Sequence, residues 1–205
     1  MNLRDEATLE AGPVVANCRM NRGRGLRDYT RELGVDIVAR RPARWLDVGC
    51  GEGRALLDAE AALPEAVLVG IDLVDHFRAL PTRARFLVGP IRDVDPGGPF
   101  DLVTAVHAIH YVGDKLGSLE RLRRFLAPDG LLLAHIDFAH VQGASSRQVH
   151  GWLRARGYAW DRHRHLISAV GPPPEAPPAW RFVGAFETGP NFTGQPAVAS
   201  VYAGG

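Results

Sequence analysis

The sequence predicts an α/β fold in which helices cover both faces of a mostly parallel sheet. Short apolar runs alternate with helical stretches from residue 43 to residue 137, as in strands joined by crossover helices. The first of these runs enters a glycine-rich loop that opens a helix. With 205 residues, 46% hydrophobic and 23% charged, the chain has the size and composition of one globular domain.

Each apolar run is expected to form a strand of this sheet. The five runs of the central region are ARWLDV at 43–48, AVLVGID at 66–72, ARFLVG at 84–89, FDLVTAVHAIH at 100–110 and GLLLAHID at 130–137. Three later segments, around 166–170, 180–186 and 198–202, also have strand character. Periodicity does not give the order of these strands in the sheet.

The helices are predicted from apolar stripes and capping residues. Leu26, Tyr29, Leu33 and Ile37 recur at three- and four-residue steps, which predicts one amphipathic helix that Arg41-Pro42 should end. A second helix is expected to follow Gly53.

A third helix is expected from about Asp114, before the run at 130–137. Leu116, Leu119, Leu122 and Leu126 form its stripe. Glu120 is placed to pair with Arg124, and the turn at 127–130 should end the helix. A fourth helix is expected from Ser145 to Arg156. Its apolar face is Val149, Trp152 and Leu153, and Gly157 is its left-handed terminator.

Charge and composition favour a small-molecule partner. Lys plus Arg is 24 against 23 for Asp plus Glu, a formal charge of +1, so we expect no nucleic-acid or membrane partner. Two cysteines and the lack of a signal peptide or long apolar run favour a cytoplasmic location. A monomer or homodimer is expected, although the sequence does not decide between them. We divide the single globular unit into an N-terminal arm with a cap helix, 1–42, and a cofactor-binding region, 43–205.

The most informative motif is LDVGCGEG at 46–53. Glycines at alternate positions permit positive φ and remove the Cβ atoms that would separate the backbone from a bound molecule. Taken alone, the motif fits an ordinary tight turn between a strand and a helix equally well. Cys50, inside it, is interpreted as a small packing residue.

A carboxylate at the next strand end favours a nucleoside. Asp72 ends the run at 66–72, and a carboxylate beside a glycine loop can accept hydrogen bonds from both hydroxyls of a ribose. A dinucleotide fingerprint would need a small residue at position 54, where this chain has Arg54. The pair therefore predicts an adenosine-containing cofactor other than a dinucleotide.

These motifs resemble those of the class I S-adenosylmethionine (SAM)-dependent methyltransferases over about residues 43–137. The resemblance is carried in order by LDVGCGEG at 46–53, VGIDL at 69–73, FDLVTAVHAIHYVGD at 100–114 and LAPDGLLLAHID at 126–137. It implies a Rossmann-like, doubly wound sheet of seven strands, with SAM as cofactor and S-adenosylhomocysteine (SAH) as product.

The resemblance also implies roles for the residues at matching positions. Gly49, Gly51 and Gly53 would pass beneath the methionine part of SAM, with Asp47 orienting its ammonium group. Asp72 would bind the ribose, Leu73 and Ile91 would pack on the adenine, and His107 would lie near the sulfonium. The chain departs from the pattern after Gly89: Pro90 stands where the family often has an acid that contacts adenine, so Asp93 or a backbone carbonyl is expected there.

Methyl transfer from a sulfonium mainly requires alignment of the nucleophile and exclusion of water. His110 is the candidate general base, and Tyr111 is expected to shape the pocket. An equally good interpretation is that His110 packs at the strand end. His163 and His165 should share one face of a strand, where solvation is favoured over metal binding, and no metal is expected.

Two flanking segments are candidates for the substrate site. The polar stretch 17–25 is expected to form a lid: Arg22 or Arg24 would meet the SAM carboxylate or an acidic substrate, and Asn21 and Tyr29 offer further donors. The turn-rich stretch 188–196 places Asn191 as a substrate contact, or forms an ordinary loop.

Three functions fit these residues. The first is a methyltransferase acting on a small molecule, with a role in secondary metabolism. The second keeps SAM but uses it in a cyclisation or elimination of its own aminobutyryl group. The third is a non-catalytic SAM-binding subunit. The sequence does not decide between O-, N- and C-methylation.

Overall fold

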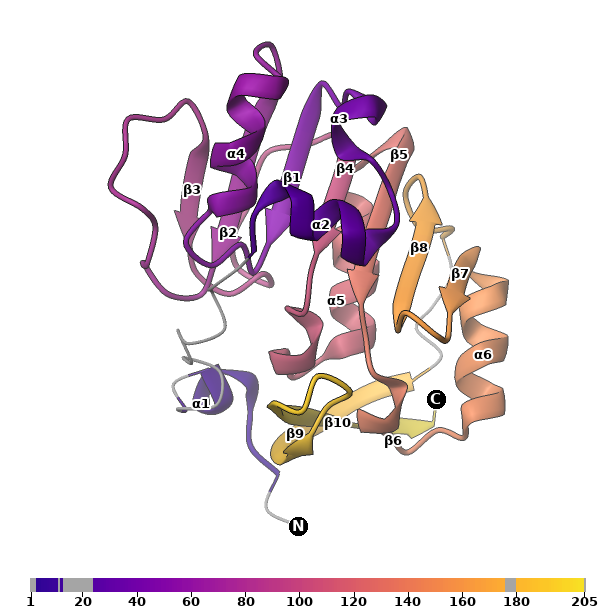
Figure 1. Cartoon of the computed structure of the whole chain (residues 1–205). Coiled ribbons are helices and arrows are strands. Elements are labelled where there is room, and N and C mark those ends of the chain that lie inside the picture. The colour runs from indigo at the N-terminus through magenta and orange to yellow at the C-terminus, as the bar shows by residue number, and fades with distance from the viewer. Residues whose placement is uncertain (1–2, 11, 13–23, 176–179, 205) are drawn as a thin grey trace.

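The computed structural model describes residues 3–10, 12, 24–175 and 180–204. Its elements, in chain order, are α1 (Glu6–Glu10), α2 (Leu26–Leu33), α3 (Ile37–Arg40), β1 (Arg44–Val48), α4 (Arg54–Ala62), β2 (Val67–Asp72), β3 (Arg85–Val88), β4 (Phe100–Ala105), η2 (Ile109–Tyr111), α5 (Lys115–Arg124), β5 (Leu126–His135), η3 (Phe138–His140), β6 (Val141–Gln142), α6 (Ser146–Ala155), β7 (Tyr158–Asp161), β8 (Leu166–Val170), β9 (Trp180–Pro190) and β10 (Pro196–Gly204). Figure 1 shows that most of them surround one central sheet.

The central sheet has seven strands in the order β3-β2-β1-β4-β5-β8-β7. Strands β1 to β5 pair in parallel, whereas β8 is antiparallel to both β5 and β7. The predicted fold class, a doubly wound and mostly parallel sheet of seven strands, is confirmed. Because β1 to β5 are parallel, their carboxyl ends lie together at one end of the sheet, which is the lower end in Figure 1. We call this end of the strands the carboxyl edge of the sheet.

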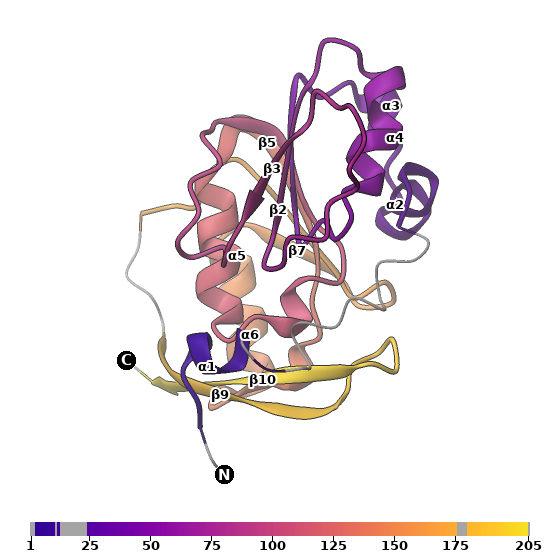
Figure 2. The same ribbon diagram turned by 90° about the vertical axis from the view of Figure 1, so that its left-hand side faces the viewer.

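Helices cover both faces of this sheet, as Figure 2 shows: α2, α3 and α4 lie on one side and α5 and α6 on the other. On the first side, Tyr29, Leu33 and Ile37 pack in one buried cluster with Trp45 of β1. The apolar stripe predicted for the N-terminal helical region is therefore buried as expected.

That region is two helices and not one, which corrects the sequence interpretation. Gly34 has φ 68° and ends α2, since its N–H bonds the carbonyl of Thr30. The chain restarts at Asp36, whose carboxylate accepts a hydrogen bond from the N–H of Ala39 at 2.9 Å. A left-handed glycine followed by an N-cap aspartate breaks the helix although its apolar spacing continues.

The expected pairing of Glu120 with Arg124 is also wrong. Glu120 instead lies 2.8 Å from the guanidinium of Arg156 and accepts a hydrogen bond from the hydroxyl of Tyr158 at 3.0 Å. These partners bring α6 and β7 against α5, a long-range contact that helical spacing does not reveal. Leu126 belongs to β5, so α5 ends before the last leucine of its predicted stripe.

The fourth predicted helix is confirmed as α6. Ser145 is its N-cap and forms a capping box with Gln148, and Gly157, with φ 71°, follows its end. The next four residues form β7, a strand that the sequence interpretation missed because it is so short. His163 and His165 lie in the turn between β7 and β8, not on a strand as expected.

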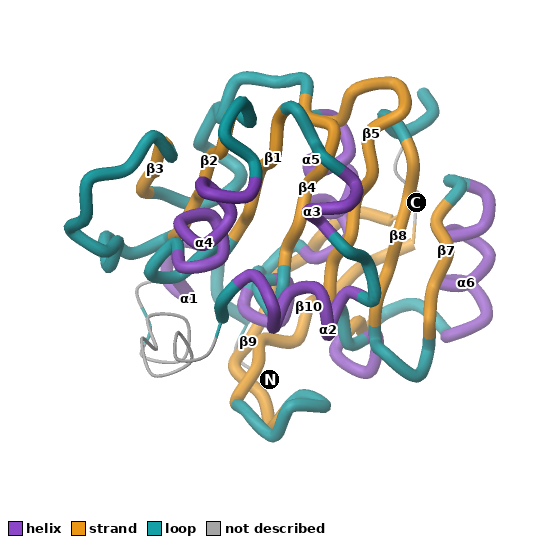
Figure 3. Tube along the Cα trace, turned by 45° about the horizontal axis from the view of Figure 1, so that its top comes forward, coloured by secondary structure: helices purple, strands orange, loops and turns teal. Residues whose placement is uncertain are grey.

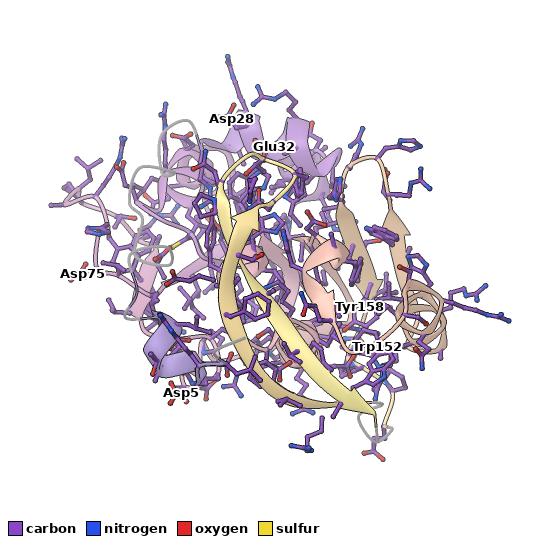
Figure 4. All side chains as sticks on the ribbon, turned by 90° about the horizontal axis from the view of Figure 1, so that it is seen from below. Asp5, Asp28, Glu32, Asp75, Trp152 and Tyr158 are labelled. Atoms are coloured by element: carbon purple, nitrogen blue, oxygen red, sulfur yellow. The ribbon has the colours of Figure 1, made fainter. Side chains whose placement is uncertain are left out.

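Strands β9 and β10 are present as predicted, but they do not belong to the central sheet. They form a hairpin that pairs with β6 in a second, three-stranded sheet. Figures 2 and 4 show this hairpin lying across the end of the central sheet where the carboxyl ends of the parallel strands are. In Figure 3, tilted by 45° from Figure 1, β9 and β10 lie at the lower end of the central strands.

The hairpin is fixed to the segment that follows β4. The ammonium group of Lys115, which is fully buried, donates to the carbonyls of Val198 at 2.6 Å and Val112 at 2.9 Å. Ser200 donates to the carbonyl of Gly113 at 2.5 Å. Burial lowers the pKa of Lys115 to about 7. The carbonyl of His110 is a third acceptor, so the three protons of the charged ammonium group each have a partner.

Candidate functional site

The glycine loop, residues 49–53, connects β1 to α4 at the carboxyl edge of the sheet. Gly49, Gly51 and Gly53 have φ of 65°, 58° and 76°, a region that glycine adopts far more readily than other residues. The N–H groups of Gly49 and Cys50 both donate to the carbonyl of Ile71 at the end of β2. The loop is therefore held against β2 with its backbone free of side chains at the glycines.

Cys50 packs inside this loop, as the sequence interpretation expected. Its thiol is 3% exposed, and burial raises its pKa well above the usual value. A protonated, buried thiol is a poor nucleophile.

Asp72 lies beside the glycine loop, as predicted. One carboxylate oxygen accepts the N–H of Gly51 at 2.7 Å, and the other accepts the N–H of Val74 at 3.2 Å. The side chain is partly exposed, so lone pairs remain for a ligand. A carboxylate and a bare backbone thus share one surface of the sheet edge.

Asp47 is the centre of a buried hydrogen-bond network. Tyr29 donates to one of its oxygens at 2.7 Å, and Thr104 donates to the other at 2.7 Å. Thr104 in turn accepts the indole N–H of Trp45 at 2.8 Å. Burial raises the pKa of Asp47 to about 6. Asp47 and Tyr29 therefore contact each other, and this hydrogen bond ties α2 to β1 just before the glycine loop.

The raised pKa of Asp47 predicts a pH dependence of stability. Between its unfolded value of 3.8 and about 6, the folded chain binds more protons than the unfolded chain, so this residue lowers the free energy of unfolding as pH rises. The loss is about 3 kcal/mol across that window. Chemical denaturation of ligand-free protein should show it in wild type and not in Asp47→Asn. A difference between the two proteins that stays constant with pH would contradict this.

Arg24 reaches into the space between the glycine loop and the end of β4. Its guanidinium donates to the carbonyl of Gly49 at 3.0 Å and to the hydroxyl of Tyr29 at 3.3 Å, and it also bonds the carbonyl of Val106. Two carbonyls that lie on different strand ends thus converge on one cation. Of the other residues predicted on this arm, Asn21 and Arg22 lie outside the described residues.

Leu73 and Ile91 follow the neighbouring strands β2 and β3, which pair through Asp72 and Val88. Ile91 is 8% exposed and Leu73 is partly buried, so both remain candidates for packing against a ring at this edge. Asp93 is exposed and pairs with Arg92 at 3.4 Å.

Four of the eight histidines of the chain gather at the ends of β4 and β5. This histidine cluster consists of His107, His110, His135 and His165. His107 and His135 stack with ring centroids 4.4 Å apart. Phe192, from the turn between β9 and β10, stacks on His165 at 4.1 Å and meets His110 edge-on at 5.1 Å. The C-terminal hairpin thus covers the cluster.

The two histidines predicted near the methyl group differ in access. His107 has a quarter of its side chain exposed, and its Nε2 lies 2.7 Å from a carboxylate oxygen of Glu32. His110 has no exposed surface, and burial lowers its pKa well below the usual value. Tyr111, next to it, has a pKa raised by burial and faces Asn191. The structure thus brings His107, His110, Tyr111 and Asn191 to one place.

Sequence reasoning missed Glu32, His135 and Phe192 as members of this site. Glu32 lies one helical turn from Tyr29 on α2, and His135 is the last residue of β5. The rule that strand ends at the carboxyl edge carry functional residues would have selected His135. The position of Phe192 depends on the packing of β9 and β10 into a second sheet, which the strand character of these segments does not reveal.

The strand order, together with a glycine loop and an acid at the ends of β1 and β2, is the architecture of the class I methyltransferases. Residues 19–170 match the family model described as methyltransferase domain. The chain belongs to this family.

Curated relatives share part of the chain. Trans-aconitate 2-methyltransferase of Methylobacterium nodulans is 35% identical over 114 residues, covering 51% of this chain and 44% of that protein. Nocamycin O-methyltransferase of Saccharothrix syringae is 34% identical over 116 residues, covering 51% and 41%. The chain thus spans less than half the length of these relatives.

Solved structures support the fold. The plantazolicin methyltransferase BpumL, in complex with a pentazolic desmethylPZN analog and SAH, matches with a TM-score of 0.52 and 17% identity over 78% of this chain and 63% of that chain. A chain of the complex between the Haloferax volcanii Trm112 methyltransferase activator and a methyltransferase matches with a TM-score of 0.51 and 18% identity, over 83% and 100%. Within the described ranges, every helix is too short or too polar to cross a membrane.

Proposed function

We propose that the chain transfers the methyl group of SAM to a small-molecule acceptor. The observation that carries the proposal is that the Asp72 carboxylate lies beside the glycine loop. This carboxylate can accept hydrogen bonds from both ribose hydroxyls, and the glycines leave the neighbouring backbone free of side chains. Membership of the methyltransferase domain family supports it. The named relatives act on trans-aconitate and nocamycin, which are small molecules.

The residues at the sheet edge fit a nucleoside with an amino acid attached. Asp72 would accept hydrogen bonds from the ribose hydroxyls, while Leu73 and Ile91 would flank the adenine. Gly49 is so close to Ala108 that a Cβ at position 49 would lie 2.4 Å from the Cβ of Ala108. The loop and the segment after β4 therefore leave little room for anything but glycine there.

The contacts of Arg24 indicate how the methionine end would be held. The carbonyls of Gly49 and Val106 accept hydrogen bonds from the guanidinium cation of Arg24, and the SAM ammonium is a cation of the same charge. Arg24 would then turn to the SAM carboxylate, for which a guanidinium is a bidentate partner. Asp47 and Tyr29 would hold this part of the site in shape.

SAM supplies a methyl carbon bonded to a positively charged sulfur. The acceptor's lone pair would form a new bond to that carbon while the carbon–sulfur bond breaks and its electrons pass to sulfur, which would give SAH. The protein has to align the acceptor and exclude water, and such alignment can lower the activation free energy by up to about 10 kcal/mol. Phe192 and the hairpin supply the cover over the histidine cluster, and a neutral imidazole would take the proton of a protonated acceptor.

His110 is the base predicted from sequence, and His107 is the more accessible imidazole. Because His107 is a quarter exposed and His110 is fully buried, we expect His107→Gln to lower kcat by about 100-fold or more, with the SAM Kd within a few-fold of wild type. His110→Gln should lower kcat less. Steady-state kinetics and calorimetry on both variants make the comparison. A larger loss of kcat in His110→Gln would restore His110 as the base.

The choice of partner is part of the same proposal. A formal charge of +1 gives no attraction to nucleic acid or to an anionic membrane, so a small molecule is the proposed partner. That the chain is cytoplasmic, as a monomer or homodimer, stays a proposal. An acceptor from secondary metabolism fits the nocamycin relative.

The function is tested by incubating the purified chain with SAM, with and without a panel of hydroxylated and carboxylated small molecules. SAH that forms only with an acceptor supports methyl transfer. Thioadenosine products without an acceptor would favour chemistry on the aminobutyryl group of SAM. Calorimetry that shows no heat with SAM or SAH, but heat with a nicotinamide dinucleotide, would overturn the proposal.

A further inference from the structure

Two members of the histidine cluster and a carboxylate from α2 meet with their metal-donor atoms close together. Glu32 lies on α2, His107 follows β4 and His135 ends β5. One carboxylate oxygen and one ring nitrogen from each histidine all lie within 4.8 Å of one another. We call these three residues the donor triad.

The backbone holds the donor triad in place. Strands β4 and β5 pair in parallel, with Ala105 opposite Ala134, so His107 and His135 leave the sheet side by side. Their rings are nearly parallel, at an interplanar angle of 8°. His107 has φ 57°, a conformation that costs free energy in a residue other than glycine and is concentrated at functional sites.

One ring nitrogen of each histidine in the triad, Nδ1, lacks a hydrogen-bond partner in the described part of the chain, whereas Nε2 of His107 pairs with Glu32. His135 is 3% exposed, and its Nδ1 is buried without a hydrogen-bond partner among the described residues. The Nδ1 atom of His107 is likewise buried without a hydrogen-bond partner among the described residues. Buried polar atoms are nearly always satisfied, and one left alone costs about 1–3 kcal/mol. A ligand that accepts nitrogen lone pairs would remove this cost.

We propose that Glu32, His107 and His135 bind a divalent transition-metal ion of the zinc type. Two imidazoles and one carboxylate are a donor set for zinc, cobalt or iron, whereas magnesium and calcium prefer oxygen ligands alone. Zn–N and Zn–O bonds are about 2.0–2.2 Å, so the rings of His107 and His135 would have to tilt out of their stacked arrangement to bring the three donors to one ion. This differs from the absence of a metal that we expected from the sequence, because Glu32 and His107 are 75 positions apart.

Three protein ligands leave at least one coordination position open, as in catalytic zinc sites. If the proposed function holds, an ionisable oxygen of the acceptor, such as a hydroxyl or carboxylate, would bind the ion at this open position. The ion would then lower the pKa of that oxygen, so that in the metal-loaded chain His107 would act as a ligand and not as the general base. The binding of the ion itself does not depend on SAM.

Zinc binding to tag-free protein, first freed of metal with a chelator, tests the proposal by calorimetry. Cobalt, whose visible spectrum reports coordination, gives a second readout. We expect one ion per chain in wild type and an affinity more than 100-fold weaker in Glu32→Gln, because the loss of an outer-shell partner alone costs about 10- to 100-fold. Glu32→Gln keeps the size of a half-buried side chain, and His135→Gln, checked for folding by thermal melting, provides an independent variant.

The matched controls are Glu65→Gln and His163→Gln, which change exposed residues of the same types and should bind the ion as wild type does. Equal affinity in wild type and Glu32→Gln, or no ion at a one-to-one ratio, would overturn the metal site and leave an ordinary carboxylate–imidazole hydrogen bond. SAM binding is measured on the same samples. A chain that binds SAM without metal retains the proposed function, and one that binds metal without SAM loses only that function.

Discussion

Replacing Asp72 with asparagine is expected to weaken SAM binding by roughly 100-fold. Hydrogen bonds to a charged group contribute about 1.5–3 kcal/mol each, and the variant loses the charge and one of the two acceptor oxygens offered to the ribose. Tenfold in Kd corresponds to about 1.4 kcal/mol. Calorimetry with SAM and with SAH measures the change, which should be similar for both because they share the ribose.

Asp75→Asn is the matched control for this experiment. Asp75 lies three residues further along the same connection, is exposed and lies at the periphery of the molecule in Figure 4. It undergoes the same change of charge, so a long-range electrostatic effect would appear in both variants. If the two substitutions altered the Kd equally, the ribose role of Asp72 would be lost.

The second large effect is expected for Gly49→Ala. A Cβ at this position would lie 2.4 Å from the Cβ of Ala108, and φ is 65°. A left-handed alanine costs about 1–2 kcal/mol, and overpacking against a backbone-attached atom adds about 1–3 kcal/mol. We therefore expect the free energy of unfolding to fall by about 2–5 kcal/mol in urea denaturation, together with a loss of SAM affinity.

Two other glycines separate the contributions to this effect. Gly157 also has a positive φ, of 71°, but a Cβ there would meet no atom within 4 Å, so Gly157→Ala should show the backbone cost alone. Gly151 lies within helix α6 with equally open space, and Gly151→Ala should be neutral or stabilising. A loss of stability in Gly49→Ala no greater than in Gly157→Ala would show that Ala108 moves aside without cost.

Local patterns were sufficient to predict most of the central sheet. The runs that became β1 to β5 are apolar enough to be recognised singly, and capping residues such as Ser145 fixed α6. The predictions were wrong where a short segment interrupts an element or where a contact joins residues far apart in the sequence. The interruption at Gly34 divided one apolar stripe into α2 and α3, and the partner of Glu120 lies 36 positions away, at Arg156.

The candidate site divides in the same way. The placement of Gly49, Gly51 and Gly53 beside Asp72 could be predicted, because the loop and the strand end are each short, contiguous patterns in the sequence. The neighbours of His107 could not, because Glu32 and His135 reach it only through the packing of α2 on the sheet and the pairing of β4 with β5. Roles for single histidines were assigned from sequence, whereas the structure presents them as a group.

The anchoring of the C-terminal hairpin has an evolutionary consequence. Lys115, Ser200 and Tyr202 tie its strands to the segment after β4, yet the tip that carries Phe192 projects beyond these anchors as a short turn between β9 and β10. On the proposed function, substitutions at the tip would alter the cover over the histidine cluster and leave the glycine loop and Asp72, at the ends of β1 and β2, untouched. A lineage of such enzymes would then diversify its acceptors by exchanging a handful of residues in this turn.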